Sequence, residues 1–181
     1  MTTTKIATRL TLLSSALLMS TMMWAQQPAP KPKASPDTVS TGQINGANIT
    51  INYSTPSVKG RPVWGSEMVP YGQVWRAGAN TSTTFTTDKD LMVEGQKLPA
   101  GKYSLYILVE ENAWTYIFNS QTGQWGITRD HKTTEDPAKD VIRVKVKTGR
   151  TDNFYERLAY VIDAKGFSLR WENLQGWVSV K

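Results

Sequence analysis

Two tryptophans, a tyrosine, two arginines and an asparagine lie among glycines and prolines in one stretch of the chain, residues 61–80. Indole and phenol rings stack on sugars and flat ligands, while guanidinium and amide groups donate forked hydrogen bonds to carboxylate, phosphate or hydroxyl groups. This composition is too aromatic for a solvated linker and too broken for a helix or central strand, so we expect a long ordered loop. The candidate ligand-binding residues are Arg61, Trp64, Tyr71, Trp75, Arg76, Asn80 and, from a second turn-rich segment, Trp125.

The same side chains also fit a structural role. Trp64, Tyr71 and Trp75 can close one end of a β-sandwich, with Arg61 or Arg76 bonded to buried partners. A binding site requires in addition that the loop carrying Trp125 lies at the same end of the fold. We therefore hold two interpretations of this segment, a site for a small polar molecule or glycan and a plug of the core.

Catalytic and metal-binding patterns are sparse in this sequence. His131 is the only histidine, so no histidine cluster or Ser-His-Asp set with a second candidate base exists. We interpret His131 as an exposed loop residue. The alternative is a hydrolase that uses loop carboxylates such as Asp130 or Asp136 with His131 as base. The chain has no cysteine, which excludes thiolate chemistry and disulfides.

Two groups of acidic residues invite comparison with calcium sites. Neither matches a 12-residue loop with alternating oxygen ligands, so we interpret both as turn acids and expect no metal and no cofactor. The groups are Asp88, Asp90 and Glu94, and Asp130, Glu135, Asp136 and Asp140.

The first 36 residues have the features of an export signal and a spacer. Lys5 and Arg9 precede an apolar run, residues 10–23, and Ala25 offers a cleavage point. The run is too short for a membrane span. We expect a signal peptide at 1–25, a Pro-rich linker at 26–36 and one domain at 37–181, located in the periplasm or secreted, with no transmembrane segment after cleavage.

The basic charge of the chain is concentrated in this same N-terminal part. Lys5 and Arg9 supply two of the six net positive charges and Lys31 and Lys33 another two, which leaves +2 for residues 37–181. So small an excess does not predict a nucleic-acid partner. A third alternative is a protein-interaction module that docks through a sheet edge or the Pro-rich tail.

The segment 37–181 has the alternation of an all-β domain. Residues 48–54 place Ile49, Ile51 and Tyr53 on one face. Residues 102–109 and 113–119 form the strongest predicted strand pair, and 102–109 is apolar on both faces, which places it near the middle of a sheet. Further strands are predicted at 82–87, 91–93, 141–147, 154–163, 167–171 and 177–180. We expect a two-sheet sandwich or jelly-roll-like fold of about nine or ten short strands.

Several motifs resemble one exported bacterial family, catalogued as domain of unknown function 2911. They include Trp-Arg-Ala-Gly-Ala-Asn at 75–80, Leu-Pro-Ala-Gly-Lys-Tyr at 98–103 and Gln-Trp-Gly at 124–126. The similarity runs from about Ser35 to Lys181, and Ala77 stands where the family often has threonine. The resemblance implies a secreted or periplasmic β-sandwich. It supplies no reaction, substrate or catalytic residue.

Overall fold

The computed structural model describes residues 31–181, and the strands confirm the predicted all-β fold. The strands are β1 (Asp37–Ile44), β2 (Ala47–Ser54), β3 (Gln73–Trp75), β4 (Thr84–Thr87), β5 (Leu91–Val93), β6 (Gln96–Leu98), β7 (Gly101–Val109), β8 (Ala113–Asn119), β9 (Asp140–Asp163) and β10 (Gly166–Ser179). In the described part of the chain the helical structure is a single 3-10 turn, η1 (Pro137–Lys139). The predicted signal peptide, 1–25, and the start of the predicted linker, 26–30, lie outside the described residues.

Strand β7 lies at the centre of the main antiparallel sheet, whose order is β1-β2-β4-β7-β8-β9-β10. It pairs with β4 along its first half, with β3 along its last three residues and with β8 on its other side. Leu105 and Ile107 are buried on one face and Tyr106 on the other. Ser104 shares the outer face with Tyr106 and donates to Gln124 Oε1 at 3.2 Å, because the segment after β8 covers that face. The predicted position of this strand near the middle of the sheet is confirmed.

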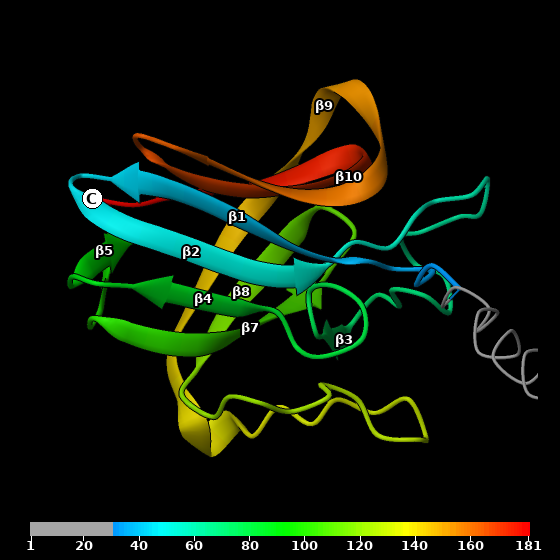
Figure 1. Cartoon of the computed structure of the whole chain (residues 1–181), viewed down its shortest axis with the longest axis horizontal. Coiled ribbons are helices and arrows are strands. Elements are labelled where there is room, and N and C mark those ends of the chain that lie inside the picture. The colour runs from blue at the N-terminus through cyan, green and yellow to red at the C-terminus, as the bar shows by residue number, and fades with distance from the viewer. Residues whose placement is uncertain (1–30) are drawn as a thin grey trace, which may run out of the picture. The chain divides into compact units, whose positions relative to one another are not determined.

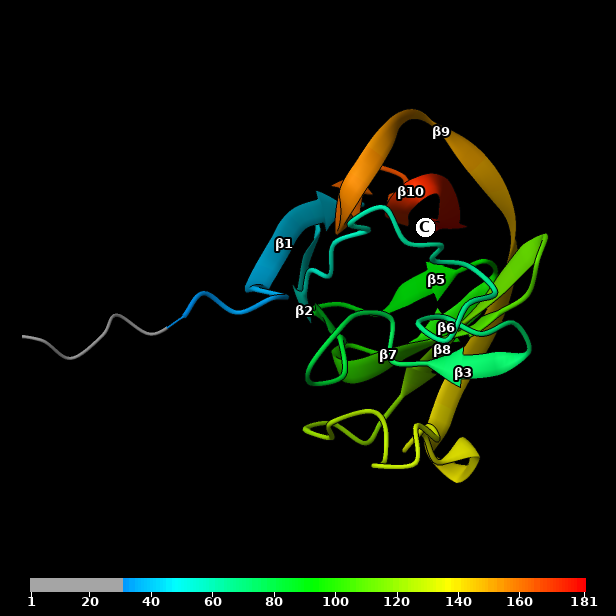
Figure 2. The ribbon, with the colours of Figure 1, turned by 90° about the vertical axis from the view of Figure 1, so that its right-hand side faces the viewer.

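Strand β9 connects two layers, as its arch over the molecule shows (Figures 1 and 2). Its first residues, Asp140 to Lys147, pair with β8, and the remainder pairs with β10. The β5–β6 hairpin continues the β10 layer, since Met92 and Lys181 exchange both backbone hydrogen bonds at 2.7 and 2.8 Å. Phe167 of β10 packs against Phe85 of β4 with ring centroids 5.3 Å apart, which joins the layers through the core.

One side of the two layers is closed by hydrogen bonds between β1, β2 and β9. Ser40 Oγ donates to Tyr160 O at 2.8 Å, and Val58 N donates to Glu156 O at 2.8 Å just after β2 ends. Two long segments, 55–72 and 120–136, extend at one end of the fold, which lies at the right in Figure 1 and faces the viewer in Figure 2. The strands therefore bring these segments, far apart in sequence, to the same end.

The strands differ from the prediction in several places. Strand β6 was not predicted, and the predicted strands 167–171 and 177–180 are one continuous strand, β10. Strand β1 was not predicted because its sequence is polar and its residues are mostly exposed, as suits an edge strand that lies against β9 only in part. Strand β3 is three residues long within the segment expected to be a loop, and its pairing with β7 forms it. The predicted strands 141–147 and 154–163 are one continuous strand, β9, because the intervening residues pair with β10 across two register shifts.

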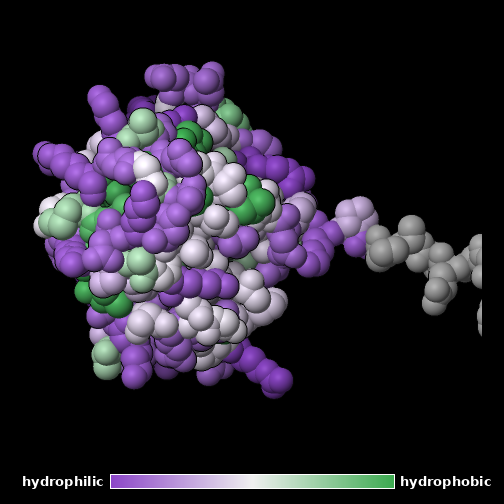
Figure 3. Space-filling view, turned by 60° about the vertical axis from the view of Figure 1, so that its left-hand side comes forward, coloured by the Kyte–Doolittle hydropathy of each residue, from purple (hydrophilic) through white to green (hydrophobic). Residues whose placement is uncertain are grey.

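Exposed apolar side chains are spread over the surface rather than gathered together. Figure 3 shows them as separate green patches among polar residues on the face turned toward its viewer. Val39, Met92 and Phe154 belong to β1, β5 and β9, respectively. Isolated apolar residues of this kind are normal on protein surfaces and do not by themselves indicate a docking surface.

Candidate functional site

A cleft lies between the segment 61–80 and the loop 127–132. Its inner cavity has a volume of about 160 Å³ and opens beside a broader outer cavity of about 1120 Å³. Five residues line both, namely Glu67, Met68, Pro70, Gln73 and His131. The two cavities thus adjoin, and their walls come from two loops, from β3 and from Trp171 of β10.

Tryptophans form the floor of this cleft. Trp75 at the end of β3 is 8% exposed, and its ring stacks on that of Trp171 from β10, with centroids 6.0 Å apart and an interplanar angle of 17°. Both rings line the inner cavity. Trp64 packs behind them, 4.6 Å from the ring of Trp114 and edge-on to Trp171 at 5.8 Å. Trp64 is partly buried and packs against the core, while Trp75 belongs to the core and also lines the cleft.

Arg76 is the most unusual polar residue at the inner cavity. Its side chain is half-buried, and this burial lowers the pKa of its guanidinium. It donates one long hydrogen bond, from Nη1 to Trp125 O at 3.3 Å, and makes no ion pair within residues 31–181. A half-buried cation without a counter-charge is costly, so its donors are available to a ligand.

The turn at Gln124–Gly126 holds Arg76 in place. The guanidinium carbon lies 5.7 Å from the centre of the Trp125 ring, a cation–π arrangement. Gly126 has a φ of +90°, and a Cβ at that position would lie 2.6 Å from Arg76 Cβ. Trp125 itself is 55% exposed and does not line the cavity. It contributes to the cleft through Arg76.

The other candidate residues are dispersed. Arg61 lines the outer cavity and donates to the carbonyls of Val58 and Ser57 at 3.1 and 2.9 Å. Tyr71 is 43% exposed and lines neither cavity. Asn80 donates from Nδ2 to Ser35 O at 2.9 Å and so fastens the beginning of the domain.

Sequence reasoning missed several residues of the cleft. Glu67, Met68 and Gln73 lie within the segment 61–80 but lack the ring or guanidinium that marked the candidates. His131, expected as an exposed loop residue, is indeed exposed and also lines both cavities. The sequence does not predict that His131 lies close to residues 61–80, because this proximity depends on the order of strands in the sheet.

A family model described as a protein of unknown function (DUF2911) matches residues 35–180. The chain belongs to this family. No curated protein and no solved structure matches the chain. The DUF2911 match therefore includes the whole cleft but assigns no chemistry to it.

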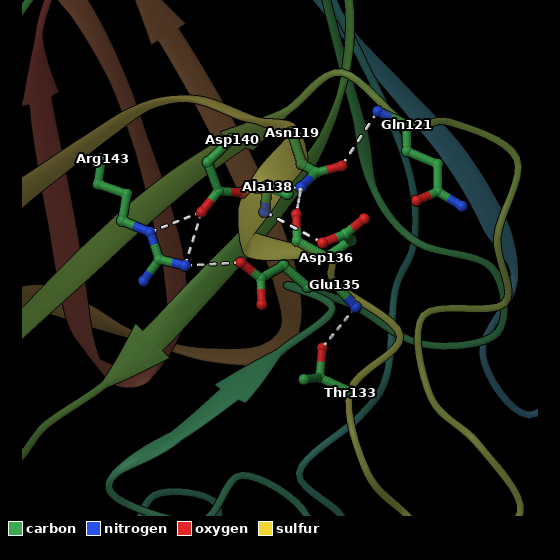
Figure 4. Close-up of polar contacts among 8 residues, drawn as sticks. All are labelled: Asn119, Gln121, Thr133, Glu135, Asp136, Ala138, Asp140 and Arg143. Carbon is green, nitrogen blue, oxygen red and sulfur yellow. Dashed lines mark hydrogen bonds and ion pairs between the residues drawn. The ribbon is translucent and has the colours of Figure 1, made fainter.

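A second polar cluster of this DUF2911 domain lies outside the cleft, where the loop 120–139 returns to β9 (Figure 4). Arg143 Nη2 lies 2.6 Å from both Glu135 Oε1 and Asp140 Oδ2, and the two carboxylate side chains are only 3% and 9% exposed. Asn119 Nδ2 donates to Asp140 Oδ1 at 2.7 Å. Burial, with the Asp140 carboxylate close by, raises the pKa of Glu135 to about 7, an effect that Arg143 partly offsets.

These acids have structural partners rather than the arrangement of a metal site. Asp136 caps η1 by accepting from Ala138 N at 3.0 Å, and Asp88 accepts from Asn48 N at 2.7 Å. Within residues 31–181 no group of three or more acidic or histidine side chains is placed to hold a metal ion. No helix in the same residues is long and apolar enough to cross a membrane.

Proposed function

We propose that this domain is a binding module that takes a small polar ligand or glycan in the cleft between residues 61–80 and 127–132. The observation that carries the proposal is Arg76, a half-buried cation beside a cavity floored by tryptophans. Within residues 31–181 its guanidinium makes one long hydrogen bond. Apolar walls with a few convergent polar groups are the usual composition of a small-molecule site.

The proposal is tested by a ligand screen on the full domain. Tryptophan fluorescence and thermal shift are measured against a panel of sugars and small polar metabolites. A binder is expected to lose affinity in Arg76→Gln and to keep it in Arg150→Gln, a matched change at an exposed position of β9 that lines neither cavity. If Arg76→Gln retains full affinity for every binder, the cleft is not the binding site.

A hydrolase is the second candidate, because Asp130 and His131 both line the outer cavity. A carboxylate next to a histidine at the mouth of a cleft can support general acid–base chemistry. An activity screen on ester, amide and glycoside substrates tests this. Full activity in His131→Ala removes the histidine from the mechanism.

We also propose that the protein acts outside the cytoplasm. The support is the positive residues, apolar run and cleavage point of residues 1–25. N-terminal sequencing of the protein produced with its leader is expected to start at Gln26, whereas an intact Met1 would oppose export by this route.

A further inference from the structure

The donors of Arg76 define what kind of ligand the cleft accepts. A guanidinium has five N–H donors, and among residues 31–181 only Nη1 has an acceptor, at the long distance of 3.3 Å. Partial burial already favours loss of its charge, as the lowered pKa of the guanidinium shows. The missing partner is therefore an acceptor, and a negatively charged one offsets the buried charge best.

The Arg76 side chain has two further contacts, and neither is an acceptor for its Nε or Nη2 groups. The Trp125 ring lies 5.7 Å from the guanidinium carbon, a cation–π contact. The backbone of Gly126 packs against the aliphatic stem, since a Cβ there would meet Arg76 Cβ at 2.6 Å and Cδ at 3.0 Å. A guanidinium held in this way presents its in-plane N–H groups as a fork, which matches the two oxygens of a carboxylate.

The inner cavity sets the size of the rest of the ligand. Its volume is about 160 Å³, and a cavity of about 150 Å³ is large enough to hold benzene. Most of its wall is apolar, with contributions from Met68, Val74, Trp75, Ile127 and Trp171. One ring, or an acyl chain of similar volume, fills this space.

The other charges at the cleft favour a single negative group over a multiply charged one. Glu67 lines both cavities and makes no ion pair with Arg76. Its carboxylate opposes a second negative charge on the ligand. In the outer cavity the two cations, Arg61 and Lys132, are matched in number by the carboxylates of Glu67 and Asp130. A phosphate ester, with nearly two charges at neutral pH, fits this distribution less well than a carboxylate.

We propose that the ligand is a small organic monocarboxylate whose carboxylate pairs with Arg76 and whose apolar body, about one ring in size, occupies the inner cavity. This inference rests on the proposed binding function and names its ligand class.

The experiment compares acids with their uncharged amides. The ¹⁵N-labelled full-length protein is titrated with benzoate, cyclohexanecarboxylate and hexanoate, and separately with the three matching amides, while the indole N–H signals are followed. The acids are expected to shift the indole signals of Trp75 and Trp171. The amides are expected to bind about tenfold or more weakly, the difference expected for losing a charge-assisted hydrogen bond.

Variants assign the preference to Arg76. In Arg76→Gln the acids should lose their advantage over the amides, while Arg150→Gln should keep it. Arg76→Lys retains the charge without the fork and should give an intermediate preference, and it serves as the test if Arg76→Gln fails to fold. Equal binding of acids and amides, or an unchanged preference in the Arg76 variants, overturns the monocarboxylate proposal.

The outcomes separate this proposal from the broader one. If uncharged sugars shift the indole signals of Trp75 and Trp171 and the carboxylates do not, the monocarboxylate is wrong and the binding function stands. If neither the carboxylates nor the screening panel shifts these signals, both are wrong.

Discussion

Glu135 shares its arginine with a second carboxylate, and this makes it sensitive to pH. Its pKa is raised to about 7 from an unperturbed value of 4.5, chiefly by burial and then by Asp140. Between pH 4.5 and pH 7 the folded protein therefore holds a proton at this site that the unfolded chain has released. The contribution of Glu135 to stability is complete below pH 4.5 and is lost as the pH rises through 7.

We predict that Glu135→Gln flattens the pH dependence of stability in this window. Glutamine keeps an acceptor for Arg143 and cannot ionise, so the variant should gain stability relative to the wild type as the pH rises from 5 to 8. Urea unfolding at pH 5, 6, 7 and 8 measures this. Glu111→Gln, at an exposed position, is the control. Parallel curves for Glu135→Gln and the wild type would contradict the assignment.

Two tryptophans predicted to share a site should differ sharply when truncated. Trp75 is buried against Trp171, so Trp75→Ala should cost about 3–5 kcal/mol of unfolding free energy. Trp125 is exposed and contacts Arg76, so Trp125→Ala should cost about 1 kcal/mol or less. Chemical denaturation of both variants gives the comparison. Similar losses would mean that Trp125 is part of the core.

At the scale of elements, the turn 123–126 offers a matched pair of glycines. Gly123 and Gly126 have φ values of +89° and +90°, but a Cβ on Gly123 meets nothing within 4 Å, whereas one on Gly126 meets Ser82 and Arg76. Gly123→Ala should cost about 1–2 kcal/mol for its left-handed backbone alone. Gly126→Ala should cost about 1–3 kcal/mol more because the added methyl group displaces its neighbours.

Urea unfolding curves give the stabilities of Gly123→Ala and Gly126→Ala, and the Arg76 Nε–H signal in the NMR spectrum shows whether the Arg76 side chain moves in either variant. We expect the Nε–H signal to move in Gly126→Ala and to stay in Gly123→Ala. Equal stabilities and equal spectra would show that the turn does not hold Arg76.

The strands that could be predicted from the sequence are those that bury one or both faces in the core. Strict alternation identified β2, β7 and β8, because each buries one or both faces in the core. Strand β1 lacks this signal because an edge strand needs few buried residues. The join of 141–147 to 154–163 also escaped prediction, since a polar exposed stretch is extended there only through its pairing with β10.

The candidate site was predictable only within one segment. The rings and cations of 61–80 located one wall of the cleft, where Trp75 and Arg76 lie. The opposite wall at His131 comes from a loop whose approach is determined by β8 and β9. The periodicity of a sequence does not encode strand order, so the meeting of these two loops could not be predicted. The hydrogen bond of Asn80 to Ser35 O could not be predicted for the same reason.

At the scale of the whole molecule, two backbone carbonyls just before β1 accept hydrogen bonds from residues far along the chain. Ser35 O accepts from Asn80 Nδ2 at 2.9 Å, and Pro36 O accepts from Thr55 N at 2.9 Å. Residues 31–34 are exposed, and the ion pair of Lys33 with Asp37 lies at the surface. Exposed pairs of this kind contribute about 0–1 kcal/mol. We predict that the folded domain begins at Ser35, where the family match also begins.

Two truncated chains test this boundary. A chain of residues 35–181 should unfold within about 1 kcal/mol of a chain of residues 26–181, because the contact that it loses from residues 31–34 is the exposed ion pair of Lys33 with Asp37. A chain of residues 37–181 should be less stable by a further 1–3 kcal/mol or so, since Asn80 and Thr55 lose their acceptors. Urea unfolding of the three chains at one pH gives these differences. Equal stability of the 35–181 and 37–181 chains would mean that water replaces both acceptors without cost, and a large loss already in the 35–181 chain would place part of the fold in residues 26–34.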